Sequence, residues 1–314
     1  MNRDDVVEAA KRIAGLVERT PLIETAVAGR RLWLKCECLQ TGGAFKLRGA
    51  TNRLLMLDEG ERRRGVVAFS SGNHARGVAI AARRLGIAAI IVIPADAPAV
   101  KIAGTRAEGA EIVFYDRLTE SREAIAAELA GKTGATVVPS FDDERIVAGQ
   151  GTVGLDILEQ LLEAGESPPS RIIVPTGGGG LASGIALACP DAEIVCVEPE
   201  GWDDMRRSLE GGAIVGVKKD APPTLCDALQ TPRVSPITFG VLKDRGAIGL
   251  AVSEGEVRDA VRFAWREHRL VVEPGGAVAL AALIAGKVAP AEGAVAILSG
   301  GNVDPALHAR IVGD

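Results

Sequence analysis

The chain has 314 residues, enough for about two domains, and 47% of them are hydrophobic. Its net charge of −5 argues against a nucleic-acid partner, which would require a basic surface. The N-terminus begins with charged residues and the apolar runs are too short for a membrane span, so we expect neither a secretory signal nor a membrane segment. The five cysteines form no disulfide or zinc pattern, and we expect reduced thiols in a cytoplasmic protein.

The first half of the chain changes from an N-terminal helix to alternating strands and helices. Apolar residues at helical spacing predict a first helix that Asp4 caps and that Thr20-Pro21 ends. We expect strands over 66–69, 87–93, 111–115 and 135–138, and helices over 75–85, 98–108 and 119–130. This alternation is typical of a parallel sheet with helical crossovers.

The same alternation returns in the second half. We expect helices over 145–162, 181–188, 254–268 and 276–285, and strands over 171–174, 193–197 and 294–298. The Gly- and Pro-rich segment 211–250 is the hardest to assign. The sequence therefore predicts an α/β fold of two open twisted sheets, with ligands binding in the crevice between them.

Four consecutive glycines, Gly177 to Gly180, stand between an expected strand and an expected helix. Glycines allow the backbone to approach a ligand, and a helix N-terminus offers free N–H groups and partial positive charge. The segment therefore predicts a phosphate site. No lysine follows in the P-loop pattern, and the spacing differs from that of the dinucleotide fingerprint. A tight packing turn is the alternative.

Lys46 stands between a glycine turn, Gly42-Gly43, and the expected start of a helix at 47–50. Most lysines are surface charges, and the glycines beside this one indicate a more specific role. A lysine amine that forms an imine with an aldehyde must be partly desolvated, so that it is neutral often enough to attack.

Two further polar loops follow expected strands. The loop Ser70-Ser71-Gly72-Asn73-His74 offers hydroxyls, an amide and backbone N–H groups at a helix start, a combination that suits a carboxylate. A plain helix cap would explain one serine of this loop, and a histidine such as His74 is more often a satisfied core residue. Ser299 follows the last strand, where it is either part of a turn or a hydroxyl that faces a bound ring.

These motifs, taken together and in order, resemble those of fold-type II pyridoxal-phosphate (PLP) enzymes, in particular the serine/threonine dehydratase and serine racemase family. The similarity covers nearly the whole chain, and its matching segments are 42–50, 70–74, 148–152, 177–180, 197–199, 272–276 and 299–302. The resemblance implies a tryptophan synthase β-like fold and a homodimer. It also implies a large PLP-binding domain of residues 1–64 and 143–314, with a small domain of residues 65–142 inserted in it.

The resemblance also implies the site residues. Lys46 would hold PLP as a Schiff base, and Lys46 and Ser71 would be the catalytic residues. The other implied contacts to the cofactor come from Phe45, Asn73, Gly177, Gly178, Gly179, Gly180, Leu181, Glu273 and Ser299. The implied contacts to an amino-acid substrate come from Ser70, Ser71, Gly72, Asn73, His74 and Arg122.

In family members that bind Mg²⁺ or Ca²⁺, the ligand positions correspond here to Glu198, the carbonyl of Trp202, and Asp204. Hard cations prefer such oxygen ligands. An acidic cluster that caps a helix is the alternative. The sequence departs from the family at Ala44, where serine is usual, and at Arg76, where glutamine is common, which puts a nucleotide effector contact in doubt. We expect no C-terminal regulatory domain, and hence no feedback control by isoleucine.

The resemblance implies dehydration of L-threonine or L-serine to a 2-oxo acid and ammonia. Ser71 keeps racemisation open, because serine racemases have a serine at this position. A 3-hydroxyaspartate dehydratase is another alternative. A non-catalytic small-molecule binding module of the same fold is the alternative from a different class, and Lys46 argues against it.

Overall fold

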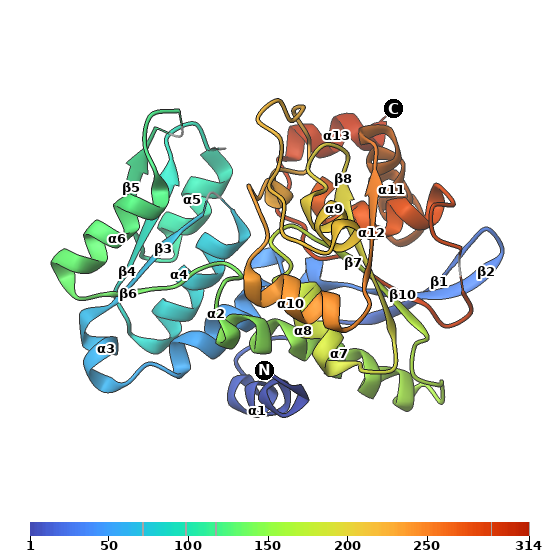
Figure 1. Ribbon diagram of the computed structural model, residues 1–314, viewed down its shortest axis with the longest axis horizontal. Coiled ribbons are helices and arrows are strands. Elements are labelled where there is room, and N and C mark those ends of the chain that lie inside the picture. The colour runs from blue at the N-terminus through green and yellow to red at the C-terminus, as the bar shows by residue number, and fades with distance from the viewer. Residues whose placement is uncertain (71, 98, 117, 290, 314) are drawn as a thin grey trace.

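The computed structural model describes residues 1–70, 72–97, 99–116, 118–289 and 291–313. Figure 1 shows two lobes, each built around its own sheet, with the N-terminal helix below the junction between them. The sheets contain four and six strands, and their topology confirms the predicted α/β fold.

The smaller sheet is parallel throughout and has the strand order β5-β4-β3-β6. Its strands are β3 (Val66–Phe69), β4 (Ala89–Pro94), β5 (Glu111–Tyr115) and β6 (Thr136–Val137). The helices around it are α3 (Glu59–Arg64), α4 (Asn73–Leu85), α5 (Ala99–Ala107) and α6 (Arg122–Thr133). This is the order that the sequence predicts, and strand β5 has the predicted bounds.

The larger sheet has the order β1-β2-β10-β7-β8-β9, and only the pair β1–β2 is antiparallel. Its strands are β1 (Leu22–Val27), β2 (Arg30–Lys35), β7 (Arg171–Pro175), β8 (Glu193–Pro199), β9 (Ile248–Val252) and β10 (Val295–Ile297). The remaining α-helices are α1 (Arg3–Ile13), α2 (Lys46–Leu55), α7 (Glu144–Glu163), α8 (Gly180–Ala188), α9 (Asp204–Gly211), α10 (Pro236–Asp244), α11 (Glu254–His268), α12 (Pro274–Ile284) and α13 (Pro305–Gly313). Three short 3₁₀ helices are η1 (Glu37–Leu39), η2 (Thr41–Gly43) and η3 (Asp227–Leu229).

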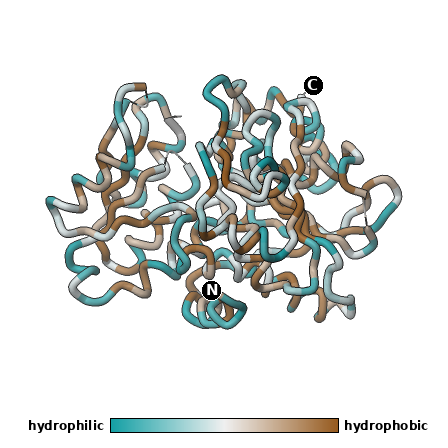
Figure 2. Tube along the Cα trace, in the orientation of Figure 1, coloured by the Kyte–Doolittle hydropathy of each residue, from teal (hydrophilic) through white to brown (hydrophobic). Residues whose placement is uncertain are grey.

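Both sheets are covered by helices on both faces, so each lobe has three layers. In the larger sheet, Ile173 packs toward α11 and α12, whereas the neighbouring Ile172 packs toward α7 and α8. Continuous apolar strands result, because both faces of a parallel sheet are buried. Figure 2 shows the hydrophobic segments concentrated along the strands inside each lobe.

Helix α2 connects the lobes and carries Lys46 at its first position. Its residues Leu47 and Leu54 belong to the core of the smaller sheet. A side chain at Gly49 or Gly149 would collide with the facing helix, so these glycines allow the backbones of α2 and α7 to touch. Because the core of the smaller sheet includes residues before position 65, the domain boundary at 64/65 stays a prediction.

The N-terminal region differs from the expectation in two ways. Asn2, rather than Asp4, caps α1, because the Asn2 side chain accepts hydrogen bonds from two backbone N–H groups in the first turn. The helix ends at Ile13, well before Pro21. The sequence-based prediction also missed the β1–β2 hairpin. Its two-residue turn, Ala28-Gly29, has positive φ angles at both residues, and the alanine gives no sequence signal for such a turn.

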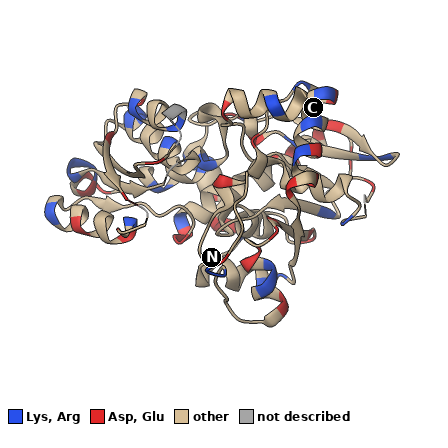
Figure 3. Ribbon diagram, turned by 90° about the horizontal axis from the view of Figure 1, so that it is seen from above, with Lys and Arg blue, Asp and Glu red and all other residues tan. Residues whose placement is uncertain are grey.

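The cysteines and the surface charges are arranged as follows. All five cysteines are free and buried. Figure 3 shows acidic and basic residues interspersed over the helices rather than separated by sign. None of the helices in the described part of the chain is long and apolar enough to cross a membrane.

Candidate active site

A pocket lies between the two sheets, at the carboxyl ends of their parallel strands. Ser70 follows β3, the four glycines follow β7, and Ser299 follows β10, and all of them line this pocket. Ligands of open α/β sheets bind at such a position. The tertiary structure thus brings together three loops that are far apart in the sequence.

Lys46 lines this pocket. Its Nζ atom donates a hydrogen bond to the carbonyl oxygen of Ser140 at 2.9 Å and lies 5.1 Å from the centre of the Phe45 ring. Burial lowers the pKa of Lys46 to about 8, because desolvation disfavours the charged form. A sizeable neutral fraction near physiological pH is what an imine-forming amine requires.

The glycines form a cradle opposite Lys46 at the start of α8. Gly179 has a φ of 86°, and a side chain there would press on Met205 and Thr238. A side chain at Gly178 would overlap the Phe141 ring. The cradle therefore requires glycine for its shape, and the free N–H groups at the N-terminus of α8 favour an anion in it.

The loop after β3 is tied to the larger sheet through hydrogen-bonded side chains. Asn73 donates to Glu273 at 2.5 Å and accepts from Asn302 at 2.8 Å, and Asn302 in turn accepts from Arg76 at 3.0 Å. Burial raises the pKa of Glu273 to about 7, and its second carboxyl oxygen has no partner among the described residues. We call Arg76, Asn302, Asn73 and Glu273 the loop relay.

His74 is 2% exposed and lines the same pocket. Its Nε2 atom lies 2.9 Å from the carbonyl oxygen of Val138, whereas Nδ1 is buried without a partner among the described residues. Burial, followed by the nearby charge of Lys46, lowers the pKa of His74 to about 3. The expectation of a satisfied core histidine is thus correct for only one of the two ring nitrogens.

The other predicted ligand contacts divide between described and undescribed residues. Phe45, Gly72, Leu181 and Ser299 all line the pocket, and their contacts to a cofactor or substrate stay predictions. Ser71, a predicted catalytic and substrate-binding residue, lies outside the described residues. The racemase alternative depends on that residue.

Charged residues complete the pocket wall, and the sequence reasoning found only one of them. Arg122 lies at the first position of α6, pairs with Glu123, and stacks over the Phe69 ring at 5.5 Å. Lys101 and Asp227 were missed; they form an ion pair from α5 to η3 across the pocket. No local motif marks them, since each is an ordinary charged residue until the two lobes meet.

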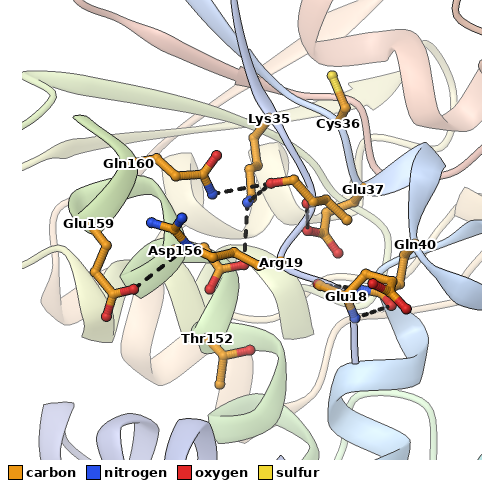
Figure 4. Close-up of polar contacts among 12 residues, drawn as sticks. Glu18, Arg19, Lys35, Cys36, Glu37, Gln40, Thr152, Asp156, Glu159 and Gln160 are labelled. Atoms are coloured by element: carbon orange, nitrogen blue, oxygen red, sulfur yellow. Dashed lines mark hydrogen bonds and ion pairs between the residues drawn. The ribbon is translucent and has the colours of Figure 1, made fainter. Parts of the chain in front are cut away.

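A second buried polar cluster lies on the other side of α2 and consists of Lys35, Glu37, Arg48 and Asp156. Figure 4 shows Lys35 and Asp156 in contact, with Glu37 close by. The guanidinium of Arg48 bonds both carboxyl oxygens of Glu37 at 2.8 and 2.9 Å, and Asp156 at 2.7 Å. Because Arg48 is two residues after Lys46, this anchor cluster fixes the start of α2 against β2 and α7.

Comparison with known proteins identifies the family. The family model described as "Pyridoxal-phosphate dependent enzyme" matches residues 13–300. The chain belongs to this family. It is 43% identical to an L-threo-3-hydroxyaspartate ammonia-lyase of Pseudomonas sp, over 98% of this chain and 97% of that protein.

Solved structures of the family have the same fold. The structure of maize serine racemase matches with a TM-score of 0.91 at 37% identity, covering 98% of this chain and 95% of that one. A threonine deaminase from T.th. matches with a TM-score of 0.90 at 40% identity, covering 97% of this chain and 99% of that one. These matches confirm the predicted fold-type II architecture and the assignment as an enzyme.

The pocket fits the cofactor of this PLP family. A cradle that side chains would fill suits a phosphate, and a buried amine with a lowered pKa faces the same space. The hydroxyl of Ser299 lines that space, whereas Glu273, a predicted cofactor contact, lies behind Asn73 and is not among the residues that line the pocket. The residues present can therefore hold PLP.

The predicted metal residues lie at the end of β8 and the start of α9 and are not among the residues that line the pocket. The carboxylate of Glu198 accepts hydrogen bonds from the backbone N–H groups of Met205 and Arg206 at 3.0 and 2.8 Å. Asp204 keeps one buried carboxyl oxygen without a partner among the described residues. Trp202 connects the two positions in sequence, with its indole bonded to the carbonyl of Pro222. The start of α9 is thus capped by Glu198 rather than by the acidic residues 200–204 of the alternative, because Asp203 makes no capping hydrogen bond. One oxygen of Asp204 remains available to a cation.

Proposed function

We propose that this PLP-family enzyme is an ammonia-lyase that converts L-threonine and/or L-serine to 2-oxobutanoate or pyruvate and ammonia. The observation that carries the proposal is the Lys46 amine, which has a lowered pKa and faces a glycine cradle across one pocket. The relatives named as threonine deaminase and hydroxyaspartate ammonia-lyase support elimination chemistry.

The chain's own residues divide the work as follows. PLP, when bound, supplies the electron-withdrawing ring that stabilises charge at the substrate α-carbon. The glycine cradle holds the phosphate, and the backbone N–H groups around Gly72 and Asn73 orient the substrate carboxylate at the start of α4. Lys46 Nζ removes the α-proton and holds it. Ser299 would offer only a neutral hydroxyl to the ring, so charge at the α-carbon would be stabilised less and prompt loss of the β-hydroxyl would be favoured.

The decisive experiment is 2-oxo acid release by the purified protein with PLP, given L-threonine and L-serine separately. Oxobutanoate or pyruvate is expected, and the Lys46→Ala variant should lose the visible cofactor band together with turnover, by on the order of 10³-fold or more. Full activity of that variant would refute the assignment.

A second substrate, 3-hydroxyaspartate, is favoured by the cationic residues of the pocket wall. Arg122 and Lys101 both line the pocket, and a second substrate carboxylate could pair with either side chain. The relative named for this activity is 43% identical. If this proposal is correct, Arg122→Gln will lower kcat/KM for threo-3-hydroxyaspartate by about tenfold or more and change the value for L-serine much less.

We extend the proposal to a Mg²⁺ or Ca²⁺ ion held by Glu198, the Trp202 carbonyl and Asp204. Burial and the neighbouring Asp204 charge raise the pKa of Glu198, and a cation would relieve both effects. Addition of Mg²⁺ should raise the Tm of the wild type but not that of Asp204→Asn. We also propose a cytoplasmic homodimer, and light scattering of the purified protein would test the dimer.

A further inference from the structure

The hydrogen-bonding state of His74 follows from its one partner. A carbonyl oxygen only accepts, so the Nε2 atom that faces Val138 must carry the proton. The opposite nitrogen, Nδ1, is then an acceptor with a free lone pair. This atom is buried in a side chain that is 2% exposed, and it has no donor among the described residues. A buried unpaired acceptor at a ligand pocket requires a donor that the mechanism supplies.

Lys46 is a donor on the helix that packs against this face of α4, and its charge acts on His74. His74 and Gly77 are three residues apart on α4 and share one helix face. A Cβ atom at Gly77 would lie 3.1 Å from the backbone carbon of Lys46, so this face of α4 packs directly on the start of α2. The side chains of His74 and Lys46 also bond to the carbonyls of Val138 and Ser140, which belong to one short segment.

The protonated amine of Lys46 has more donors than partners. An ammonium group has three N–H donors. The Ser140 carbonyl accepts one of them, and the Phe45 ring lies 5.1 Å away. A further acceptor is needed when the amine carries a proton, and His74, whose Nδ1 lacks a donor among the described residues, lines the same pocket.

We propose that His74 is a positioning residue for Lys46, and that its Nδ1 atom accepts a hydrogen bond from the Lys46 ammonium. The bond forms whenever the amine carries a proton, both in the PLP-free protein and after Lys46 has taken the α-proton of the substrate. This inference rests on the proposed role of Lys46 as the base. The histidine does not compete for that proton, because burial and the charge of Lys46 keep the pKa of His74 near 3.

Other charges around the pocket bear on the same amine. Lys101 of α5 is paired with Asp227 of η3, and Arg122 of α6 is paired with Glu123. Glu273 lies behind Asn73, with its pKa raised by burial. A variant of His74 leaves these groups in place, so a change in the Lys46 titration can be assigned to the imidazole.

Two replacements of His74 separate its two nitrogens. Glutamine can still donate to Val138 from the Nε2 position but has no acceptor at Nδ1, whereas asparagine places its amide oxygen near Nδ1 and loses the bond to Val138. In the PLP-free full-length protein, the rate of imine formation with added PLP, measured against pH, reports the pKa of the Lys46 amine. We expect His74→Gln to lower that pKa by about one unit, since hydrogen bonds stabilise the charged form.

His74→Asn should change the amine pKa less than His74→Gln and should lower the Tm more. The control is His308→Gln on α13, which should leave the amine pKa unchanged because this ring packs against Trp265 and does not line the pocket. A wild-type amine pKa in His74→Gln would overturn the proposal. Because these readouts do not depend on substrate turnover, they are distinct from a failure of the proposed ammonia-lyase activity.

A measurement on the wild type covers the case in which His74→Gln does not fold. The chain has three histidines, so ¹⁵N spectra of the PLP-free protein can be assigned by single replacements. The Nδ1 resonance of His74 should shift as Lys46 titrates, while the ring stays in one neutral tautomer. An Nδ1 resonance that is constant through this titration, or that responds only to added substrate, would overturn the proposal.

Discussion

Two buried polar clusters flank helix α2, and they differ in how completely their atoms are paired. In the anchor cluster, Lys35, Glu37, Arg48 and Asp156 satisfy one another, and none of their buried side-chain atoms lacks a partner within the described part of the chain. On the pocket side, His74 Nδ1 and one oxygen of Glu273 have no partner among the described residues. Burial lowers the pKa of a lysine in both clusters, Lys35 and Lys46, so the pairing distinguishes them.

This difference separates structural charge from functional charge. Opposite charges that are paired with one another have no free hydrogen-bonding group to offer a ligand. Removal of one partner leaves an unpaired buried charge, which destabilises the fold. Unpaired buried groups instead represent binding free energy that a ligand can recover. The same helix therefore carries a structural arginine and a reactive lysine two residues apart.

Loss of an ion-pair partner in the anchor cluster should have the largest effect on stability. Arg48→Met leaves Glu37 and Asp156 without their main partner and should lower the free energy of unfolding by about 3–5 kcal/mol. Lys46→Met should change it by less than about 1 kcal/mol, because the buried amine has no ion-pair partner among the described residues to lose. Urea unfolding of the PLP-free proteins measures both, and equal losses would contradict the comparison.

A side chain in the glycine cradle should have the next largest effect, a weaker binding of PLP. A side chain at Gly178 would overlap the Phe141 ring, so Gly178→Ala should weaken PLP binding by about tenfold or more. The matched control is Gly131→Ala in α6, where no described atom lies within 4 Å and φ is not positive. The control should bind PLP normally and gain about 0.5–1 kcal/mol of stability. PLP titration followed by absorbance would show whether the two variants differ.

The buried carboxyl of Glu273 should make the stability of the protein depend on pH. Because the pKa of Glu273 is raised to about 7, the folded protein retains a proton that the unfolded chain releases above about 4.5. Stability from this group is therefore full below about pH 4.5 and is lost as the pH rises through about 7, by roughly 3 kcal/mol. Glu273→Gln should remove this slope. Unfolding of both proteins at pH 5 and pH 8 gives the difference, and parallel profiles would count against it.

The smallest effect comes from the outer end of the loop relay. Arg76→Gln can still donate to Asn302 but removes the positive charge, so it should change the PLP dissociation constant by only about two- to fivefold. Asn302→Ala interrupts the relay beside Asn73 and should have the larger effect of the two. Fluorescence titration with PLP gives the dissociation constant of each variant. A larger effect of Arg76→Gln than of Asn302→Ala would show that Arg76 does not act on PLP binding through Asn302.

Much of the fold could be predicted because local periodicity is strong where strands are buried on both faces. Strand β5 and helix α11 have the bounds that the sequence predicts. Strand β9 was missed, because it lies in a Gly- and Pro-rich segment and pairs with β8 across a long sequence separation. The cap of α1 was assigned to the wrong residue, since Asn2 and Asp4 are both good caps and only the backbone decides between them.

The sequence alone determined the local features of the site: one lysine after a glycine turn, one glycine cradle, and two polar loops after strands. These features are local, because turn geometry and helix starts depend on neighbouring residues. Tertiary structure alone decided which charges are paired. Lys101 meets Asp227, Arg48 meets Asp156, and His74 keeps a nitrogen without a partner among the described residues, because packing of distant helices sets these distances.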